Sequence, residues 1–338
     1  MRLLVTGGCG FIGTNFVLHI LETHPDAFIL NLDKLTYAGN RANLADLEQD
    51  SEHYAFVRGD IADKALVVSL IKERRLDAVV NFAAETHVDR SIAGPAVFAQ
   101  TNVAGTLNLL EAAREARVER FLHVSTDEVY GTLGPDGQFF ETTPLAPNSP
   151  YSASKAAADH FVRAYHETYG LDTVTTRCSN NYGPYQFPEK LVPLMRLKAK
   201  NDEPLPVYGD GSNVRDWIYV LDHCRGVELA LLKGRAGEVY NFGGAAEMAN
   251  IDVVKAILRR TGQPESLIRF VADRPGHDRR YAMNFDKARK ELGFEPAMDF
   301  ETGLDKTVEW YDNNPAWLES VQSGAYREFM DQWYKERR

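Results

Sequence analysis

Two acidic residues, Asp127 and Glu128, lie next to each other directly after Ser125 and Thr126. The apolar run before them predicts a buried parallel strand, and open α/β sheets bind ligands beyond the carboxyl ends of such strands. Two carboxyl groups in one cleft can differ in pKa and divide the roles of general acid and general base. An adjacent acidic pair is more often a solvated loop, so the prediction of a catalytic pair depends on its place against the sheet.

Tyr151 and Lys155 are four positions apart, so a helix would present both side chains on one face. An ammonium group beside a phenol stabilises the phenolate and lowers the pKa of the phenol. Such a pair can remove a hydroxyl proton while a nicotinamide accepts a hydride. The spacing is frequent by chance, and it gains weight here because the strand end at Thr126 precedes it by about twenty-five residues.

A glycine-rich segment follows the first apolar run of the chain. Gly8, Gly10 and Gly13 match the pattern G-x-G-x-x-G, and Gly7, Gly10 and Gly13 give the wider spacing G-x-x-G-x-x-G. Both are typical of a tight strand-to-helix turn that lets the backbone approach a pyrophosphate at the positive end of the helix. The segment therefore predicts a dinucleotide site, with cofactor contacts from Gly7, Gly10, Phe11, Ile12 and Gly13.

Asp33 lies twenty residues after Gly13, at the end of the second predicted strand. A carboxylate there is expected to accept hydrogen bonds from the adenosine ribose and would repel a 2′-phosphate, which favours NAD over NADP. Asp60 and Ile61 follow the third strand and could contact the adenine, although an ordinary turn explains Asp60 equally well. A glycine turn without a ligand is the alternative for the whole pattern, and the combination of strand, helix and acidic residue argues against it.

The elements that must position these residues alternate along the first half of the chain. Strand-like runs alternate with segments of helical spacing, which predicts an α/β fold with a doubly wound parallel sheet of the Rossmann type. The predicted strands are 3–6, 28–33, 54–58, 78–82, 121–125 and 172–177, and the predicted helices are 16–23, 65–73, 96–116 and 152–169.

The pattern changes after about residue 180. Prolines interrupt the helical periodicity there and predict loops and short elements; they are Pro184, Pro188, Pro193, Pro204 and Pro206. Further helices are predicted at 220–232, 251–261, 285–292 and 300–313. We expect an NAD-binding domain over residues 1–182, to which about 216–242 return, and a smaller mixed substrate-binding domain over about 183–215 and 243–338. One continuous domain is the alternative.

Composition limits the class of protein. With 338 residues, 44% hydrophobic and 25% charged, the chain is typical of a soluble globular protein, and its net charge of −10 argues against nucleic-acid binding. We expect no membrane segment, because glycines interrupt the apolar start and no later run is long enough. The three cysteines are scattered, so we expect neither disulfides nor a metal site, and a cytoplasmic location fits best.

Several motifs together resemble the extended short-chain dehydrogenase/reductase superfamily and, within it, the nucleoside-diphosphate-sugar 4,6-dehydratases. The specific parts are the run from Asp33 to Asn40 and the triplet Thr126-Asp127-Glu128, whereas the glycine motif and the Tyr/Lys pair occur throughout the superfamily. Other similar segments are 83–89, 177–185, 187–191 and 274–278, so the resemblance covers residues 1 to about 310.

The resemblance implies a lyase whose cofactor is NAD, bound tightly and recycled in each turnover. Tyr151, helped by Lys155 and Thr126, would take the 4-hydroxyl proton of the sugar while the C4 hydride passes to NAD. Glu128 would then remove the acidified C5 proton, Asp127 would protonate the departing 6-hydroxyl, and the hydride would return to C6. The implied substrate is dTDP-glucose, and the product is its 4-keto-6-deoxy derivative.

The resemblance implies further contacts as well. For the cofactor these are Lys34, Leu35, Thr36, Ala83, Ala84, Thr101 and Asn181, beside Tyr151 and Lys155. For the substrate they are His87, Thr126, Asn180, Glu189, Lys190, Leu191, Pro206, Tyr208, Arg215, Asn250, Arg274 and His277. Arg215 and Arg274 are the expected diphosphate clamps, because guanidinium groups bind phosphate oxygens bidentately. The helices 96–116 and 152–169 resemble the pair through which family members form homodimers, although both could pack only on their own sheet.

Three alternatives stay open. The first is a dehydratase for a UDP or GDP sugar, since thymine and uracil differ by one methyl group, worth about 1 kcal/mol of burial. The second is a nucleotide-sugar 4-epimerase, against which the acidic pair argues. The third is a catalytically silent NAD-binding regulator, which would lack Tyr151, Lys155, Asp127 or Glu128, and all four are present.

Overall fold

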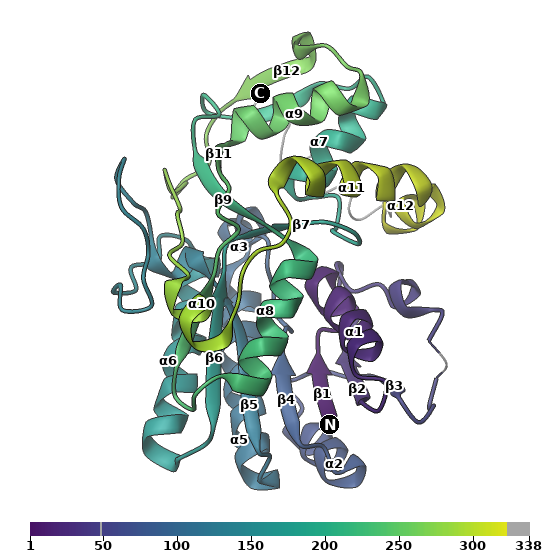
Figure 1. Cartoon of the computed structure of the whole chain (residues 1–338), viewed down its shortest axis with the longest axis vertical. Coiled ribbons are helices and arrows are strands. Elements are labelled where there is room, and N and C mark those ends of the chain that lie inside the picture. The colour runs from purple at the N-terminus through teal and green to yellow at the C-terminus, as the bar shows by residue number, and fades with distance from the viewer. Residues whose placement is uncertain (48, 323–338) are drawn as a thin grey trace.

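The computed structural model describes residues 1–47 and 49–322, and one large sheet forms its lower half (Figure 1). Among these residues the sheet has seven strands in the order β10-β6-β5-β4-β1-β2-β3, and all neighbours are parallel. The winding reverses between β1 and β4, where sheets of this kind bind ligands. The strands are β1 (Arg2–Thr6), β2 (Phe28–Asp33), β3 (Tyr54–Arg58), β4 (Ala78–Asn81), β5 (Arg120–Thr126), β6 (Thr173–Cys178) and β10 (Val239–Phe242).

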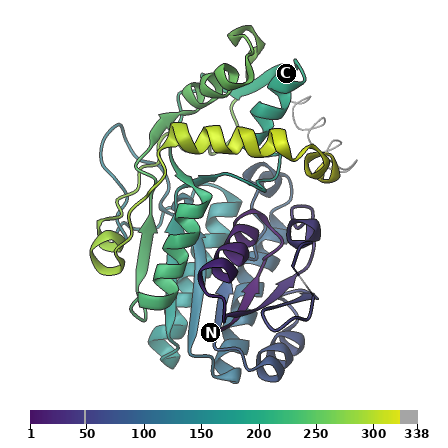
Figure 2. The same cartoon turned by 45° about the vertical axis from the view of Figure 1, so that its right-hand side comes forward.

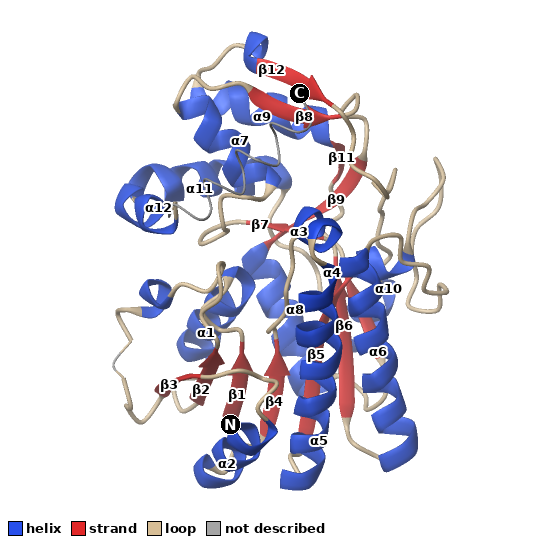
Figure 3. Cartoon of the chain, turned by 180° about the vertical axis from the view of Figure 1, so that it is seen from behind, coloured by secondary structure: helices blue, strands red, loops and turns tan. Residues whose placement is uncertain are grey.

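Helices cover both faces of this sheet. On one face α1 (Phe11–Thr23) packs against α8 (Val220–Lys233). The other face, turned to the viewer in Figure 3, carries α2 (Lys64–Arg74), α5 (Thr106–Ala116) and α6 (Pro150–Tyr169). Because helices cover both sides, β2 is buried at every position, including its polar residues Asn31 and Asp33.

Most elements of this half lie where the sequence predicts them. β2 and β3 have the predicted bounds, and the other predicted strands differ by one residue at one or both ends. The predicted helix 96–116 is interrupted, because α4 (Pro95–Phe98) runs into a π-helical segment at Ala99–Gly105 before α5 begins. Such segments are frequent at functional sites, and this one carries Thr101 to the pocket described below.

A second group of elements lies beyond the carboxyl ends of the large sheet (Figure 2). Its helices and strands share a separate apolar core. One small sheet has the order β11-β9-β7 and another pairs β12 with β8. The elements are β7 (Asn180–Tyr182), α7 (Leu191–Lys200), β8 (Leu205–Tyr208), β9 (Val214–Tyr219), β11 (Glu247–Ala249), α9 (Asn250–Thr261), β12 (Ile268–Val271), α11 (Phe300–Asn313) and α12 (Pro315–Val321).

Two of the five prolines do not interrupt regular structure as the sequence predicts. Pro193 is the third residue of α7, where its missing N–H would have no partner inside the helix. Pro206 lies within β8, which pairs with β12 alone in a two-stranded sheet. An edge strand tolerates proline because one side of it needs no ladder hydrogen bonds.

The chain crosses between the two halves several times. After β9, which belongs to a small sheet, α8 and β10 return to the large one. The helix α10 (Asp286–Leu292) also packs against α8 and β10, and Phe285, Ala288 and Leu292 join the core of the large sheet. Residues 323–338 of the expected second domain lie outside the described residues. Within the described part of the chain, no helix is both long enough and apolar enough to cross a bilayer.

Candidate active site

The glycine-rich segment forms a tight turn between β1 and α1. Gly7 has a φ of +72°, and a Cβ there would lie 2.7 Å from the backbone nitrogen of Ala83. A Cβ on Gly13 would overlap the carbonyl oxygen of Gly7. Gly10 is the N-cap of α1, whose first N–H groups have no partner within the helix. The turn therefore requires glycine and leaves a cradle of backbone donors that suits a pyrophosphate.

The carboxylate of Asp33 is held at the end of β2 by two backbone donors. The N–H of Cys9 donates to Oδ2 at 2.9 Å, and the N–H of Leu35 donates to Oδ1 at 2.8 Å. Each oxygen keeps a second lone pair that can accept a ribose hydroxyl. Burial raises the pKa of Asp33, and the two N–H groups oppose that rise. The side chain is thus oriented as the sequence predicts for a ribose ligand.

Lys34 and Leu35, which follow Asp33, take different positions. Lys34 is exposed and forms an ion pair with Asp60 at 2.6 Å. Leu35 has a φ of +56°, and it is not among the residues that line the pocket. Its backbone N–H therefore serves the site by orienting Asp33.

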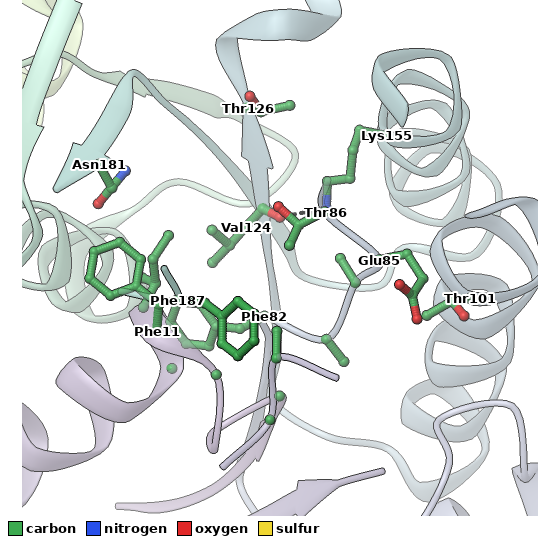
Figure 4. A pocket seen from close by; sticks show the side chains of 18 of the residues that line it. Phe11, Phe82, Glu85, Thr86, Thr101, Val124, Thr126, Lys155, Asn181 and Phe187 are labelled. Atoms are coloured by element: carbon green, nitrogen blue, oxygen red, sulfur yellow. Dashed lines mark hydrogen bonds between the residues drawn. The ribbon is translucent and has the colours of Figure 1, made fainter. Parts of the chain in front are cut away.

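One pocket runs from the glycine turn across the carboxyl ends of the central strands (Figure 4). Lys155 and Thr101 lie on one side of this view, and Phe11, Phe187 and Asn181 on the other. The predicted site residues that line the pocket are Gly7, Gly10, Phe11, Ile12, Gly13, Asp33, Lys34, Thr36, Asp60, Ile61, Ala83, Ala84, Thr101, Thr126, Asp127, Glu128, Tyr151, Lys155, Asn180, Asn181, Glu189, Lys190 and Leu191. The fold thus brings the predicted dinucleotide and catalytic groups to one cavity.

The first two turns of α6 present Tyr151 and Lys155. A capping box between Ser149 and Ser152 fixes where the helix begins. The Nζ of Lys155 donates to the carbonyl of Val124 at 2.8 Å, which directs the ammonium group to the edge of β5. Burial lowers the pKa of Lys155 to about 8.

The electrostatics of Tyr151 differ from the prediction. Burial raises its pKa well above the ordinary value, and the charge of Glu128 raises it further, while a hydrogen bond with Thr86 lowers it. The expectation that Lys155 lowers this pKa overall is wrong for the protein groups alone, because the loss of hydration dominates. Among the protein groups alone, the neutral phenol is therefore the resting form of Tyr151.

Asp127 and Glu128 begin a short 3-10 turn, Asp127–Tyr130, directly after β5. Asp127 is 2% exposed, so the solvated-loop interpretation does not apply to it. Its Oδ1 accepts the hydroxyl hydrogen of Thr126 at 3.2 Å, and its Oδ2 has no hydrogen-bond partner among the described residues. The hydroxyl of Thr126 also accepts the N–H of Glu128 at 3.3 Å. One threonine therefore orients both acids.

The two carboxyl groups differ in their surroundings. Burial, followed by the charge of Glu128, raises the pKa of Asp127 well above its ordinary value. Burial also raises the pKa of Glu128, but Arg274, Lys190 and Arg215 oppose that rise. Of the two groups, Asp127 therefore holds a proton more readily, which is compatible with the acid role that the resemblance implies for it.

Arg215 and Arg274 place two guanidinium groups near Glu128, although neither lines the pocket. Arg215 is buried, donates to the carbonyl of Asp278 at 2.9 Å, and lies 4.2 Å above the ring of Tyr281. Burial lowers its pKa, and the charge of Arg274 lowers it further, because the two cations repel. Two adjacent guanidinium groups are typical of a site for a bidentate anion such as a diphosphate.

The remaining predicted substrate residues lie outside the pocket lining. His87 is buried, and its Nδ1 accepts the N–H of Arg90 at the start of α3 (Val88–Ala93). The hydroxyl of Tyr208 donates to Asp89 at 2.8 Å, and its ring meets that of His277 edge-on at 6.0 Å. The other two are Pro206, within β8, and Asn250, the first residue of α9.

Contacts from the second half of the molecule fix the substrate side of the pocket. Asn181 donates to the carbonyl of Ser179 at 3.0 Å, and its Oδ1 lies 2.9 Å from Nδ1 of His223. The Nε of Arg90 donates to the buried Glu189 at 3.2 Å. Lys190, next to it, donates to a backbone carbonyl of the β4–α3 loop at 3.0 Å. These bonds tie β7 and the segment before α7 to the large sheet.

The site uses two residues to which the sequence gives no individual role, although the 83–87 stretch as a whole is expected on the cofactor side. Thr86 lines the pocket and shares a hydrogen bond with Tyr151. Asp89 is buried and accepts from both Tyr208 and Arg274, the latter at 3.5 Å. Both lie within the quoted segment 83–89, which was the only signal for them, since their partners are far away in the sequence.

The fold and the site define an enzyme class: a Rossmann-type dinucleotide enzyme with a Tyr/Lys pair, of the extended short-chain dehydrogenase/reductase superfamily. The family model described as GDP-mannose 4,6 dehydratase matches residues 4–307. The dTDP-glucose 4,6-dehydratase of Xanthomonas campestris pv. campestris (strain B100) is 58% identical over 342 residues, covering 96% of this chain and 97% of the relative. The chain belongs to the nucleotide-sugar 4,6-dehydratase family.

Solved structures agree with this assignment. DesIV, a dTDP-glucose 4,6-dehydratase from Streptomyces venezuelae with NAD bound, is 52% identical with a TM-score of 0.92, covering 95% of this chain and 100% of that one. The UDP-glucose 4-epimerase of Thermotoga maritima is 30% identical with a TM-score of 0.86, covering 93% and 100%. The fold is therefore shared with epimerases, so the fold alone does not distinguish the two activities.

Proposed function

We propose that the protein converts dTDP-glucose to dTDP-4-keto-6-deoxyglucose by an NAD-dependent dehydration. The observation that carries the proposal is the pair Asp127 and Glu128, a proton donor and a base in one turn beside Tyr151 and Lys155. Oxidation at C4 alone needs only the Tyr/Lys pair, whereas loss of water across C5 and C6 needs both an acid and a base. The identity of 58% to a dTDP-glucose 4,6-dehydratase supports the same substrate.

The residues of the dinucleotide site fit NAD. The cradle at Gly7 and Gly13 has no room for a Cβ, as close approach of a pyrophosphate requires. Asp33 offers two oriented oxygens to the ribose hydroxyls and would repel the 2′-phosphate of NADP. When bound, NAD supplies the hydride acceptor for C4 and the hydride donor for C6.

In the first stage Tyr151 accepts the proton of the 4-hydroxyl group. Its raised pKa makes the neutral phenol the resting form, so the positive charge of Lys155 must act with a second cation to stabilise the phenolate. Thr86 and Thr126 border the same cavity, where Thr86 hydrogen-bonds the phenol and Thr126 holds the two acids. The resulting ketone acidifies the proton on C5.

In the second stage Glu128 takes the C5 proton and Asp127 donates a proton to the departing 6-hydroxyl, which leaves as water. The three cations Arg274, Lys190 and Arg215 stabilise the carboxylate form of Glu128 before this step. Asp127 is buried, and its raised pKa favours retention of its proton until the elimination step. Return of the hydride to C6 would be accompanied by return of the proton from Glu128 to C5, which restores the base. Asp127 would then regain one proton, matching the one that Tyr151 took from the 4-hydroxyl group.

The assay that tests this function offers the protein three nucleotide sugars. We expect dTDP-glucose to yield the 4-keto-6-deoxy product, identified by NMR, at a kcat/KM higher than that for UDP-glucose or GDP-mannose. Turnover of UDP-glucose without turnover of dTDP-glucose would overturn the choice of base. Formation of dTDP-galactose instead of a keto sugar would show a 4-epimerase and overturn the dehydration.

We also propose a division of labour along the chain. Residues 1–182 with about 216–242 would bind NAD, and about 183–215 with 243–338 would bind the sugar nucleotide. The separate apolar cores on the two sides of the pocket support this division. The helix α10 lies within the proposed sugar-nucleotide part of the chain, but it packs on the core of the large sheet, so the chain passes between the two parts once more than proposed.

A homodimer through α5 and α6 is a further part of the proposal. The two helices contact each other on one face of the sheet. Tyr169, at the end of α6, is 54% exposed, and Val97, in α4, is 48% exposed, so apolar groups of this region remain at the surface. Light scattering on the purified protein should give twice the chain mass, and Tyr169→Glu should weaken the association.

The three cysteines support a cytoplasmic location. All three are free and buried, and their side chains form no disulfide. Proteins that keep buried free thiols are typical of reducing compartments.

A further inference from the structure

A row of buried polar side chains crosses the large sheet beside Lys155. It runs from Thr6 in β1 through Asn81 in β4 and His123 in β5 to Asp159 in α6 and Arg177 in β6. Each is at most 5% exposed, and none of them lines the pocket. Buried polar groups lower the stability of the folded state unless they are hydrogen-bonded or ion-paired. The partners of each residue in the row therefore decide how much stability it costs.

The hydrogen bonds at one end of the row fix the tautomer of His123. The N–H of Ala83 donates to the hydroxyl oxygen of Thr6 at 3.4 Å, and that hydroxyl donates to Oδ1 of Asn81 at 2.7 Å. The amide nitrogen of Asn81 then faces Nδ1 of His123 at 3.2 Å. Because an amide nitrogen can only donate, Nδ1 accepts, and the ring hydrogen is on Nε2.

The other end of the row places a carboxylate opposite Lys155. Nε2 of His123 lies 3.6 Å from Oδ1 of Asp159 and 3.5 Å from Nζ of Lys155. Oδ2 of Asp159 accepts from Nε of Arg177 at 2.8 Å, whereas Oδ1 has no hydrogen-bond partner among the described residues. Burial lowers the pKa of His123 well below its ordinary value, and the charges of Lys155 and Arg177 lower it further, so the ring is neutral.

Few other groups act on the charge of Lys155. Tyr151 shares its helix, and its phenol is neutral because burial raises its pKa. Cys178, on β6, is a neutral thiol, since burial raises its pKa to about 12. Burial alone lowers the pKa of Lys155, and among the described groups Asp159 opposes it most strongly.

We propose that Asp159 and His123 are positioning residues of the reaction, with Asp159 as the counter-charge that keeps Lys155 an ammonium group. His123 holds its fixed tautomer between the two charges and keeps the carboxylate from pairing directly with the lysine. Lys155 thereby retains a proton and remains free to direct its charge toward Tyr151. The inference rests on the proposed function, in which that charge assists removal of the 4-hydroxyl proton.

The test is the pH profile of the first stage in the NAD-bound enzyme. The wild-type rate of nicotinamide reduction on mixing with dTDP-glucose should fall as pH rises through the Lys155 pKa of about 8. In Asp159→Asn this alkaline limb should move to lower pH by about one unit or more, since a nearby opposite charge shifts a pKa by about 1 to 3 units. Asp172→Asn is the matched control, because it removes a carboxylate that lies just before β6 and pairs with Arg120, the first residue of β5, at 2.9 Å. Its alkaline limb should coincide with that of the wild type.

Arg177→Gln gives an independent variant that should act in the opposite direction. Without the guanidinium, the charge of Asp159 acts more strongly on Lys155, so the alkaline limb should move to higher pH. A purely structural role would lower the rates of both variants at all pH values without moving the limb, and that result would overturn the proposal. Movement of both limbs in the same direction would overturn it as well. Failure of the proposed function is distinguishable, because the wild type would then form no 4-keto product at any pH.

Discussion

Asp127→Asn separates the proton-donor role of this side chain from its structural role. The amide has nearly the shape of a protonated carboxyl group, and its oxygen can still accept from the hydroxyl of Thr126. Because burial and Glu128 raise the Asp127 pKa well above its ordinary value, the folded protein favours the uncharged form that the amide resembles. We therefore expect the free energy of unfolding at low pH, where the carboxyl group is protonated in both the folded and the unfolded state, to change by no more than about 1 kcal/mol.

The pH dependence of this variant has a definite sign. The folded-state pKa of Asp127 lies above its unfolded value, so its favourable contribution is complete at low pH and is lost as pH rises through the folded-state pKa. Each unit of elevation corresponds to about 1.4 kcal/mol. The amide does not titrate, so Asp127→Asn should become more stable than the wild type as pH rises, which denaturant titrations at several pH values will measure.

The activity of the variant should fall although its stability does not. Loss of a general acid lowers the rate of the step it assists by about 10² to 10⁴-fold. The first stage does not use Asp127, so reduced nicotinamide should accumulate after mixing with dTDP-glucose and remain while elimination stalls. Asp136→Asn, in an exposed loop, is the control and should behave as the wild type. Wild-type turnover by Asp127→Asn would refute the acid role, and so would a stalled variant that forms no reduced nicotinamide.

Three further substitutions test the two binding regions. Gly13→Ala should lower the free energy of unfolding by about 1 to 3 kcal/mol and cause loss of NAD, because its methyl group overlaps the Gly7 carbonyl. Thermal denaturation measures the stability, and the ratio of nucleotide to protein absorbance of the purified protein measures the bound NAD. Retained NAD would contradict the turn geometry. Asp33→Ala should weaken NAD binding about tenfold or more and reduce the ratio of the affinity for NAD to that for NADP. Calorimetry on protein freed of bound cofactor measures both affinities. An unchanged ratio would contradict the ribose contact assigned to Asp33. Arg215→Lys should raise the KM for dTDP-glucose about tenfold with a smaller change in kcat, as measured by steady-state kinetics. An unaltered KM would exclude Arg215 as a ligand of the substrate diphosphate.

Much of the site could be predicted because it depends on strand ends. Several strands of the large sheet end in a polar residue, as β2 ends at Asp33, β4 at Asn81 and β5 at Thr126. Carboxyl ends of parallel strands meet at one edge of a sheet, so those residues and the glycine turn had to approach one another. Local spacing also places Tyr151 and Lys155 on one helix face, and the structure puts both in the same pocket.

The parts that could not be predicted depend on contacts between distant segments. Asp89 from α3 joins Tyr208 from β8 and Arg274 from the segment after β12, and no local pattern links the three. The edge position that admits Pro206 follows from the pairing of β8 with β12, which is equally remote. The direction of the Tyr151 pKa shift required its burial, which spacing along a helix does not show.

The most direct test of the account follows a hydrogen label through one turnover. dTDP-glucose carrying deuterium at C4 is incubated with the NAD-bound protein, and the product is analysed by NMR and mass spectrometry. We expect a 4-keto-6-deoxy sugar with the deuterium at C6 of the same molecule and no net consumption of added NAD. A keto product with no deuterium at C6, or one that requires stoichiometric NAD, would contradict an enzyme that lends the hydride to its cofactor and takes it back.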